Sequence, residues 1–365
     1  MSDSDDERVR CFFRSEVLAL APYHVAESSG YVKLDAMENP YAWPEWMVEE
    51  WLLKLRGVKP NRYPDPAATA LKNIIRDTHR IAAPADLLLG NGSDELIQIL
   101  MMSLAGRQAL VAAPEPTFVM YRQIAATLGV RFVGIPLLAD DFQLDMQAMA
   151  ETLKSYRPAL VFLAYPNNPT GNLFKTEDVL RILELAPGLV VLDEAYAPFA
   201  HASFMPRLGE YGRLLVMGTV SKLGLAGLRL GFLAGAERWI AQFDKLRLPY
   251  NINILTQISA QFALSNYQVF AEQTRRICRD RDILFNEIDA LEKVTAFPSA
   301  ANFILFKLED ADAERVYASL KQSNILIKNM NPAGGVLTNC LRVTVGTEDE
   351  NRAFLTALKK ALAVS

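Results

Sequence analysis

Four groups of polar residues in this 365-residue sequence stand where apolar strands are expected to end, and each group could do chemistry. They occupy residues 90–95 (GNGSDE), 165–171 (YPNNPTG), 193–196 (DEAY) and 221–222 (SK). In open α/β sheets, ligands bind outside the carboxyl ends of the strands, so groups that are distant in sequence converge on one crevice. We therefore expect these four groups to form a single site.

The first group is suited to a phosphate. Gly92, Ser93 and Asp94 precede an expected helix at residues 96–102. Small residues and a Ser/Asp cap leave backbone N–H groups at a helix start, where anions bind well. A capped helix after a turn is the ordinary alternative, and the GxGxxG pattern is not matched because Glu95 takes the place of its third glycine.

The next two groups supply an amide and a carboxylate. Prolines at 166 and 169 bracket Asn168, so the loop is rigid enough to aim this amide into a pocket. Asp193 ends an apolar run, where a buried carboxylate is costly unless it meets a cation or a donor. A helix cap is an equally good interpretation of Asp193 in isolation.

The fourth group supplies an amine. Lys222 has apolar, glycine-bearing flanks and few charged neighbours in sequence, so a solvated surface position is the weaker interpretation. Burial would lower the pKa of this lysine and favour its reactive neutral form. A phosphate cradle, an amide, an acid and an amine are together the set that pyridoxal phosphate requires.

These groups need a framework of strands and helices to position them. Apolar runs alternate with helical stretches from about residue 86 to 235, which predicts an α/β fold with a mostly parallel sheet between helices. The runs are residues 109–113, 131–136, 159–164, 189–193, 214–219 and 229–235. A long helical stretch follows at 236–291, and a strand–helix–strand–strand–helix unit is expected from residue 294.

Composition limits the classes of function. The formal net charge of −4, without a concentrated basic run, argues against nucleic acid or an anionic membrane as partner. Residues 1–10 lack the order of a signal peptide, and no apolar run reaches spanning length, so a cytoplasmic protein is expected. The dispersed Cys and His residues predict neither disulfides nor a metal site.

The motifs resemble those of the fold type I, pyridoxal-phosphate-dependent aminotransferases over nearly the full chain. They are residues 166–171 (PNNPTG), 193–196 (DEAY), 221–222 (SK) and 227–229 (GLR), in the order and spacing of that family. The resemblance implies three catalytic residues. Lys222 would hold the cofactor as an imine and later move the substrate proton, Asp193 would pair with the pyridine nitrogen, and Tyr196 would hydrogen-bond the ring oxygen.

The same resemblance implies further contacts to the cofactor. Asn168 would share the ring oxygen with Tyr196. Phe118 would stack on the ring, with ordinary core packing as the competing view. The cofactor phosphate would be held by Gly92, Ser93, Asp94, Ser221 and Arg229.

Both ends of the chain are similar to the histidinol-phosphate aminotransferase family, through residues 20–23 (LAPY), 35–41 (DAMENPY), 61–64 (NRYP) and 340–346 (CLRVTVG). By that similarity Tyr23, Asn39 and Arg342 would line the substrate site. Arg342 suits an anion through its planar fork, although a sheet-edge arginine is the alternative. Tyr63 would reach the cofactor phosphate of a partner subunit, which implies a homodimer with a shared active site.

One departure from that family concerns the substrate phosphate. Many relatives carry an arginine where this chain has Lys328, and lysine binds phosphate as a point charge without a bidentate fork. The loop from Lys222 to Arg229 is also one residue shorter than in many relatives. From the pattern along the chain we expect an N-terminal arm (residues 1–34) packing on the small domain, a large cofactor-binding domain (35–250) and a small C-terminal domain (251–365), with the boundary within the long helical stretch.

The implied reaction is amino-group exchange between histidinol phosphate and 2-oxoglutarate, in histidine biosynthesis. Within the same fold, the alternatives are an aromatic or broad-specificity aminotransferase and a decarboxylase of a phosphorylated amino acid. A cofactor-binding sensor without catalysis is the alternative from another class. It is disfavoured because the residues before the family core are too few for a DNA-binding domain.

Overall fold

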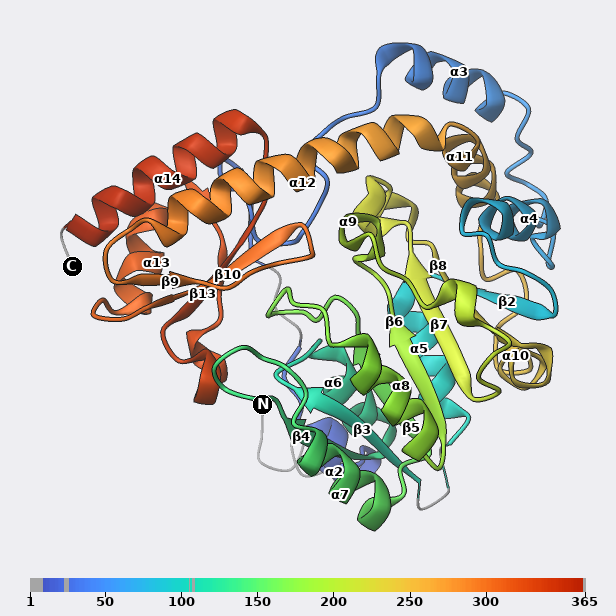
Figure 1. Cartoon of the computed structure of the whole chain (residues 1–365). Helices are drawn as coiled ribbons and strands as arrows, with labels where there is room; N and C mark the ends of the chain where they lie inside the picture. The colour runs from blue at the N-terminus through green and yellow to red at the C-terminus, as the bar shows by residue number, and fades with distance from the viewer. Residues whose placement is uncertain (1–8, 23–25, 105, 107–108, 364–365) are drawn as a thin grey trace.

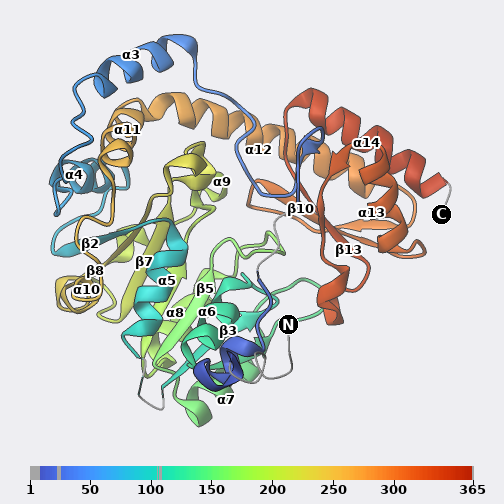
Figure 2. The ribbon, with the colours of Figure 1, turned by 180° about the vertical axis from the view of Figure 1, so that it is seen from behind.

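The chain forms two lobes that are bridged by one long helix. The computed structural model describes residues 9–22, 26–104, 106 and 109–363. Helix α12 (Tyr267–Asp289) runs from the larger lobe to the smaller one (Figure 1). The view from behind shows the same two-lobed arrangement, with α14 (Glu348–Ala363) beside α12 on the smaller lobe (Figure 2).

A seven-stranded sheet of order β2-β8-β7-β6-β5-β3-β4 forms the centre of the large lobe. Strands β4, β3, β5, β6 and β7 are parallel, whereas β8 is antiparallel to both of its neighbours. The prediction of a mostly parallel sheet is confirmed. The strands are β2 (Ala85–Gly90), β3 (Leu110–Glu115), β4 (Arg131–Pro136), β5 (Leu160–Ala164), β6 (Leu189–Asp193), β7 (Leu214–Thr219) and β8 (Gly231–Ala236).

Helices cover both faces of this sheet, which explains why its strands are continuously apolar. Successive strand residues point to opposite faces, so Leu87 and Leu89 enter one hydrophobic cluster and Leu88 enters another. One face is covered by α5 (Ser93–Met102), α6 (Met120–Leu128) and α10 (Glu237–Asp244). The other is covered mainly by α4 (Thr69–Thr78), α7 (Met146–Tyr156), α8 (Thr176–Leu185) and α11 (Ile254–Ser265).

The small lobe has a four-stranded antiparallel sheet of order β12-β13-β10-β9. Its strands are β9 (Val294–Ala296), β10 (Phe303–Leu308), β12 (Lys328–Asn329) and β13 (Cys340–Thr344), and α13 (Ala313–Gln322) and α14 pack together beside it. The expected unit began with one strand before its first helix. The structure has two strands there, β9 and β10, because residues 297–302 turn the chain back into a hairpin.

The N-terminal segment packs on both lobes. Strand β1 (Val32–Lys33) pairs with β11 (Ile325–Leu326) of the small lobe. Helix α2 (Ser15–Leu18) instead contacts α6 of the large lobe, where Arg14 donates to the carbonyl of Thr127. The expectation that the whole arm packs on the small domain is therefore wrong for α2. This short helix buries none of its own residues, so no apolar face directs it to the small lobe.

The expected limits between the domains stay a prediction, but two elements bear on them. Helix α11 lies within the part assigned to the small domain, yet it packs against α4 and α3 (Glu45–Leu55) beside the large sheet. Helix α12 contacts α9 (Ala197–Ala200) of the large lobe as well as β9 and β10 of the small one. The change from one lobe to the other thus takes place along α12.

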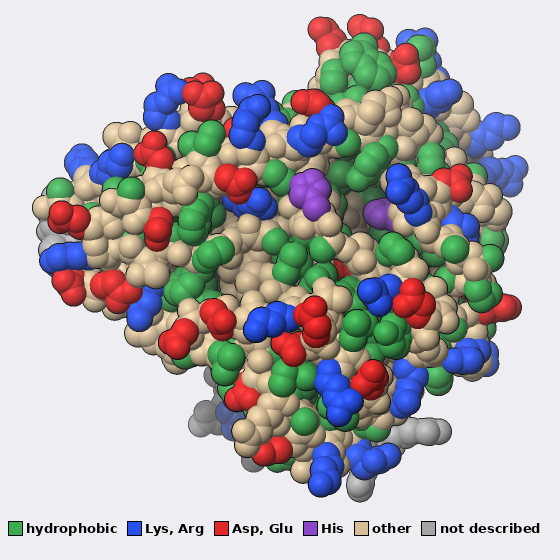
Figure 3. All heavy atoms as spheres, viewed as in Figure 1, with side chains coloured by type: hydrophobic (Ala, Val, Ile, Leu, Met, Phe, Trp, Pro, Cys, Tyr) green, Lys and Arg blue, Asp and Glu red, His purple; other side chains and the backbone are tan. Residues whose placement is uncertain are grey.

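The surface is charged with both signs. On the face seen in Figure 3, Lys and Arg side chains alternate with Asp and Glu side chains without forming one continuous basic area. In the described part of the chain, no helix combines the length and the apolar character that crossing a membrane requires.

Candidate active site

A cavity at the carboxyl edge of the large sheet brings together most of the predicted residues. Those that line it are Ser93, Asp94, Phe118, Asn168, Asp193, Tyr196, Ser221, Lys222 and Arg229. Met37, Thr219 and Ala195 also contribute to its wall. Most of these residues follow β5, β6 and β7 or begin α5, while Phe118 follows β3 and Arg229 precedes β8, which is the convergence expected of an open α/β sheet.

Lys222 lines this cavity from a 3-10 turn (Ser221–Leu223) that follows β7. Its ammonium group donates to the carbonyl of Ala36 at 3.0 Å and lies 5.8 Å from the centre of the Tyr196 ring. Burial, together with the positive charges of Arg342 and Arg229, lowers the pKa of Lys222 to about 8. A neutral, nucleophilic amine is therefore accessible near physiological pH.

Asp193 lies at the end of β6 and is buried. The hydroxyl of Tyr121 donates to Asp193 Oδ2 at 2.7 Å, and the backbone N–H of Ala195 donates to Oδ1 at 3.2 Å. Burial raises the pKa of Asp193 to about 6, although both hydrogen bonds oppose the shift. An acid in this setting can hold or share a proton with a basic nitrogen.

Tyr121 was not predicted as a site residue. It lies on α6, stacks on Phe162 with ring centroids 4.6 Å apart, and meets Phe118 edge-on at 5.6 Å. The helical spacing of Tyr121, Ile124 and Ala125 marks it as a core position. The one feature of the sequence that could have indicated its role is the hydroxyl group, because a buried tyrosine usually needs a hydrogen-bond partner.

Asn168 connects Tyr196 to Arg342. Its amide nitrogen donates to the Tyr196 hydroxyl at 3.1 Å, and its oxygen accepts from Arg342. Arg342 also donates to the carbonyl of Asp35 at 3.1 Å and lies over the ring of Phe303 at 5.1 Å. Burial raises the pKa of Tyr196, with the charge of Arg342 opposing the shift, so the phenol stays protonated.

The far end of the cavity offers donors for an anion. Helix α5 begins there at Ser93 without a side-chain cap hydrogen bond, after Gly92 with a φ of 81°. Arg229 lies 3.7 Å from Asp94, and a Cβ atom at Gly92 would be only 2.6 Å from the Arg229 guanidinium. The hydroxyl of Thr219, which was not predicted, donates to Ser221 Oγ at 2.9 Å. Backbone N–H groups, two hydroxyls and a guanidinium suit a phosphate.

Six predicted residues are not among those that line this cavity. Two of them adjoin it: Gly92 directly precedes Ser93, and Arg342 donates to Asn168. The other four lie elsewhere. Tyr23 lies outside the described residues. Tyr63 is 81% exposed and stacks on Tyr250 with ring centroids 4.4 Å apart. The side-chain amide of Asn39 donates hydrogen bonds to the carbonyl of Leu223 and to Oε1 of Gln273.

The fourth, Lys328, lines a neighbouring cavity together with Arg342, Asp35 and Met37. It pairs with Arg342 across β12 and β13, which places two cations on adjacent strands. The second cavity, which lies next to the first, could therefore bind an anionic group at the far end of a substrate.

The residues present fit pyridoxal phosphate. An amine, a buried acid and an anion cradle line one cavity, and an aromatic residue, Phe118, also forms part of its wall. The model for "Aminotransferase class I and II" matches residues 29–358. The chain belongs to the class I and II aminotransferases. Its Asp193 ends strand β6, and its Lys222 lies in the turn after the neighbouring strand β7.

Over nearly its whole length, this aminotransferase is similar to proteins named histidinol-phosphate aminotransferase. It is 52% identical over 353 residues to "Histidinol-phosphate aminotransferase 2" of Nitrosococcus oceani, covering 97% of this chain and 98% of that protein. It is 47% identical over 362 residues to "Histidinol-phosphate aminotransferase 1" of Ralstonia nicotianae, covering 98% of this chain and 96% of that protein.

Solved structures agree on the fold of this aminotransferase. Histidinol-phosphate aminotransferase from Sinorhizobium meliloti, in complex with pyridoxal-5'-phosphate, superposes with a TM-score of 0.86 at 23% identity, covering 97% of this chain and 98% of that one. L-threonine-O-3-phosphate decarboxylase from Porphyromonas gingivalis superposes with a TM-score of 0.77 at 20% identity, covering 90% and 99%. The fold is therefore shared between transamination and decarboxylation, and it cannot decide between them.

Proposed function

We propose that this aminotransferase transfers the amino group of histidinol phosphate to 2-oxoglutarate, reversibly, with pyridoxal phosphate as cofactor. The observation that carries the proposal is the convergence of Lys222, Asp193 and the Asn168–Arg342 pair on one edge of the sheet. The full-length similarity to relatives of that name supports the choice of substrate. The pathway served would be histidine biosynthesis.

Each residue has a role that follows from its position. Bound pyridoxal phosphate supplies an electron sink that weakens the bond between the substrate Cα and its hydrogen. Lys222, whose pKa is lowered to about 8, would take the proton from the substrate Cα and deliver it to C4′ of the cofactor. With the cofactor bound, Asp193 would keep a proton on the ring nitrogen, and Tyr196 with Asn168, which are hydrogen-bonded to each other, would hold the ring oxygen.

The substrate would be recognised at its two ends. Arg342 reaches both Asn168 and the backbone of Asp35, so it stands where the first cavity meets the second. Lys328 lines the second cavity and would face the substrate phosphate as a point charge. We place Tyr23 and Asn39 in the substrate site from the family resemblance alone.

We also propose that the enzyme is a cytoplasmic homodimer in which Tyr63 of one subunit reaches the cofactor phosphate of the other. The side chains of Tyr63 and Leu248 are 81% and 72% exposed. Large apolar side chains that are exposed close together often mark a surface that another protein covers. Tyr250, on which Tyr63 stacks, and Leu255 are exposed as well. A partner subunit would cover these side chains.

A substrate panel tests the proposed reaction. The purified enzyme with pyridoxal phosphate is given histidinol phosphate, phenylalanine, tyrosine and O-phosphothreonine, each with 2-oxoglutarate. We expect kcat/KM for histidinol phosphate to exceed the values for phenylalanine and tyrosine by at least about a hundredfold, because a built phosphate site discriminates strongly against substrates that lack the phosphate. Preference for phenylalanine would contradict the proposal, and release of carbon dioxide from O-phosphothreonine would identify a decarboxylase.

A further inference from the structure

The segment at residues 35–42 holds two cations of the active site through successive carbonyl groups. The carbonyl of Asp35 accepts from Arg342 at 3.1 Å, and the carbonyl of Ala36 accepts from Lys222 at 3.0 Å. The same segment is pinned to the small lobe, where the N–H of Met37 donates to Thr344 Oγ1 at 3.0 Å. A shift of this segment would therefore move the partner of the reactive amine.

Asn39 fixes the other end of the segment to the loop that carries Lys222. Its amide nitrogen donates to the carbonyl of Leu223 at 3.0 Å, and its oxygen accepts from the N–H of Tyr41 at 2.9 Å. The amide lies directly on Gly224, where φ is +116° and a Cβ atom would be 2.9 Å from Asn39 Nδ2. The two residues that follow Lys222 thus lie against this one side chain.

Gln273 on α12 completes the set of hydrogen bonds that orients the Asn39 amide. Gln273 Oε1 accepts the second N–H of Asn39 at 2.9 Å, and Gln273 Nε2 donates to the carbonyl of Ala42 at 3.0 Å. The Tyr41 N–H requires an acceptor from Asn39, and the Ala42 carbonyl requires a donor from Gln273. Only one orientation of the two amides satisfies all four contacts.

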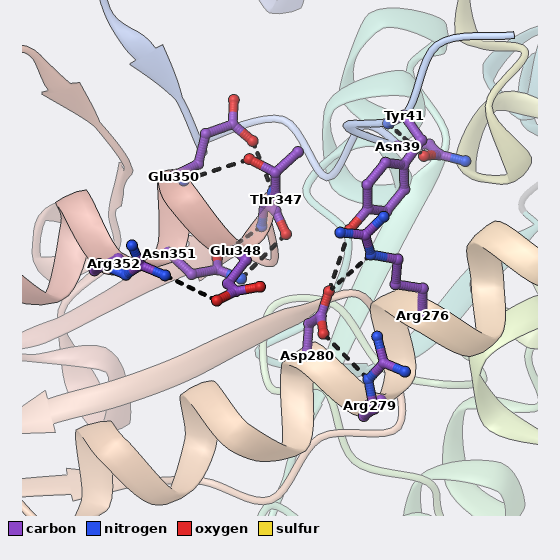
Figure 4. A network of polar contacts seen from close by, with 11 residues as sticks. Asn39, Tyr41, Arg276, Arg279, Asp280, Thr347, Glu348, Glu350, Asn351 and Arg352 are labelled. Carbon is purple, nitrogen blue, oxygen red and sulfur yellow. Dashed lines mark hydrogen bonds and ion pairs between the residues drawn. The ribbon is translucent and has the colours of Figure 1, made fainter. Parts of the chain in front are cut away.

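Other residues of α12 brace the same segment. The Tyr41 hydroxyl donates to Asp280 at 3.2 Å, and the guanidinium of Arg276 lies over the Tyr41 ring at 4.6 Å. Figure 4 shows Asn39 and Tyr41 lying above α12, with Asp280 between Arg276 and Arg279. The helix that bridges the lobes is therefore joined to the lysine loop by side chains rather than by backbone pairing.

We propose that Gln273 is a positioning residue for Lys222, acting through Asn39 on the Leu223–Gly224 backbone. This inference rests on the proposed function of Lys222 with pyridoxal phosphate, but it does not depend on which substrate the enzyme uses. Small displacements of a reacting group from its working geometry lower rates strongly, so an oriented amide chain behind the lysine affects turnover without touching the substrate. Gln273 also links the position of α12 to that of the amine.

The test compares Gln273→Met, which removes both hydrogen bonds, with Gln273→Glu, which keeps an acceptor facing Asn39 and loses only the donor to the carbonyl of Ala42. Gln268→Met is the matched control, because Gln268 is exposed on the same helix. In the cofactor-free proteins, hydrogen exchange of the amides at residues 222–225 is measured. We expect it to be about fivefold faster in Gln273→Met and within about twofold of the wild type in the other two variants.

The cofactor-loaded proteins are then compared in the half-reaction with glutamate. Gln273→Met should lower kcat about tenfold while KM changes less than about twofold, and Gln273→Glu should restore most of the rate. A lower Tm for Gln273→Met with unchanged exchange and unchanged kcat would show a merely structural role and overturn the inference. Equal losses of kcat in the Met and Glu variants would contradict the action through Asn39.

Failure of this inference can be told apart from failure of the proposed function. Borohydride treatment of the cofactor-loaded wild type, followed by peptide mapping, tests whether Lys222 carries the cofactor at all. If Lys222 is not labelled, the proposed function fails first and the positioning role with it. If Lys222 is labelled and the Gln273 variants behave as the control does, only the positioning role is wrong.

Discussion

At the scale of single residues, the buried carboxyl group of Asp193 lowers the stability of the folded protein at neutral pH. The folded protein raises the pKa of this buried carboxyl from 3.8 to about 6, so the folded state holds the proton more tightly than the unfolded state does. Its contribution to stability is therefore fully present below about pH 4 and is lost as pH rises to about 6. Above that pH the loss is constant, on the order of 3 kcal/mol.

Asp193→Asn should remove this pH-dependent loss, since an amide does not ionise. In the cofactor-free protein we expect the variant to be more stable than the wild type at about pH 7.5, and close to it at about pH 4. Its turnover should fall at least about a hundredfold, because an uncharged amide cannot keep a proton on the ring nitrogen. Urea unfolding at the two pH values, with turnover measured in parallel, checks both parts. A variant that is less stable at the higher pH and still active would refute the assigned role.

Lys222 leads to a second pH-dependent prediction. Because burial and neighbouring cations lower its pKa to about 8, the neutral fraction of the amine rises about tenfold per pH unit below that value and levels off above it. The rate at which cofactor-free protein attaches pyridoxal phosphate should follow the same curve. Stopped-flow absorbance after mixing measures this rate directly.

A variant of Arg342 separates the causes of that lowered pKa. Arg342→Gln removes a cation that lowers the pKa of Lys222, so the midpoint of the rate curve should move to higher pH. Arg352→Gln is the control, since Arg352 is exposed on α14 and pairs with Glu348. A midpoint that is the same in all three proteins would show that the charge of Arg342 is not felt at the amine.

At the scale of elements, the anion cradle depends on how closely β8 approaches the start of α5. A Cβ atom on Gly231 would lie 2.6 Å from the carbonyl carbon of Gly92 and 2.7 Å from the backbone nitrogen of Ser93. These neighbours are backbone atoms, which cannot rotate away. The phosphate-binding end of the helix therefore requires glycine on the adjacent strand.

Gly231→Ala should push the cradle away from β8 and weaken cofactor binding about tenfold, with a loss of roughly 1–3 kcal/mol in stability. Gly227→Ala is the matched control, because a Cβ atom at Gly227 would meet nothing within 4 Å. Equilibrium dialysis with pyridoxal phosphate measures the affinity, and urea unfolding measures the stability. Equal affinities in the two variants would mean that the close approach has no bearing on the phosphate.

The sequence predicts the elements with local signals and misses those that depend on tertiary contacts. Apolar runs identify β3 to β8, and polar residues at strand ends identify Asn168, Asp193 and Lys222. Strand β2 did not figure among the expected runs, because Asp86 interrupts it and leaves a continuous apolar part of only three leucines. Tyr121 was missed because its helical spacing is that of a core residue, and the role of Asn39 became visible only once α12 was placed beside it.

At the scale of the whole molecule, the active site is assembled from both lobes. Arg342 comes from β13 of the small lobe and donates to Asn168, which follows β5 of the large lobe. The segment at residues 35–42 and helix α12 also join the two lobes. A change in the angle between the lobes would therefore alter the anion site and the lysine environment together.

The proposed dimer predicts that two inactive variants restore each other. Lys222→Ala removes the amine, and Tyr63→Ala removes the group that would reach the partner's cofactor phosphate. A hybrid dimer has one site with both residues intact and one site with neither. Random pairing makes half of all dimers hybrids, so about a quarter of the wild-type sites should be active.

Co-expression of the two variants with different affinity tags, followed by purification on both tags in turn, isolates the hybrid. It should have about half the wild-type activity per dimer, because one of its two sites is complete. Each variant purified alone should have far less, and tandem-tagged wild type gives the reference. If Tyr63 instead acts within its own subunit, the hybrid has no intact site: one subunit lacks the amine and the other lacks the tyrosine. Activity no higher than the mean of the two parents would then exclude a shared site, and failure to recover any doubly tagged protein would exclude the dimer itself.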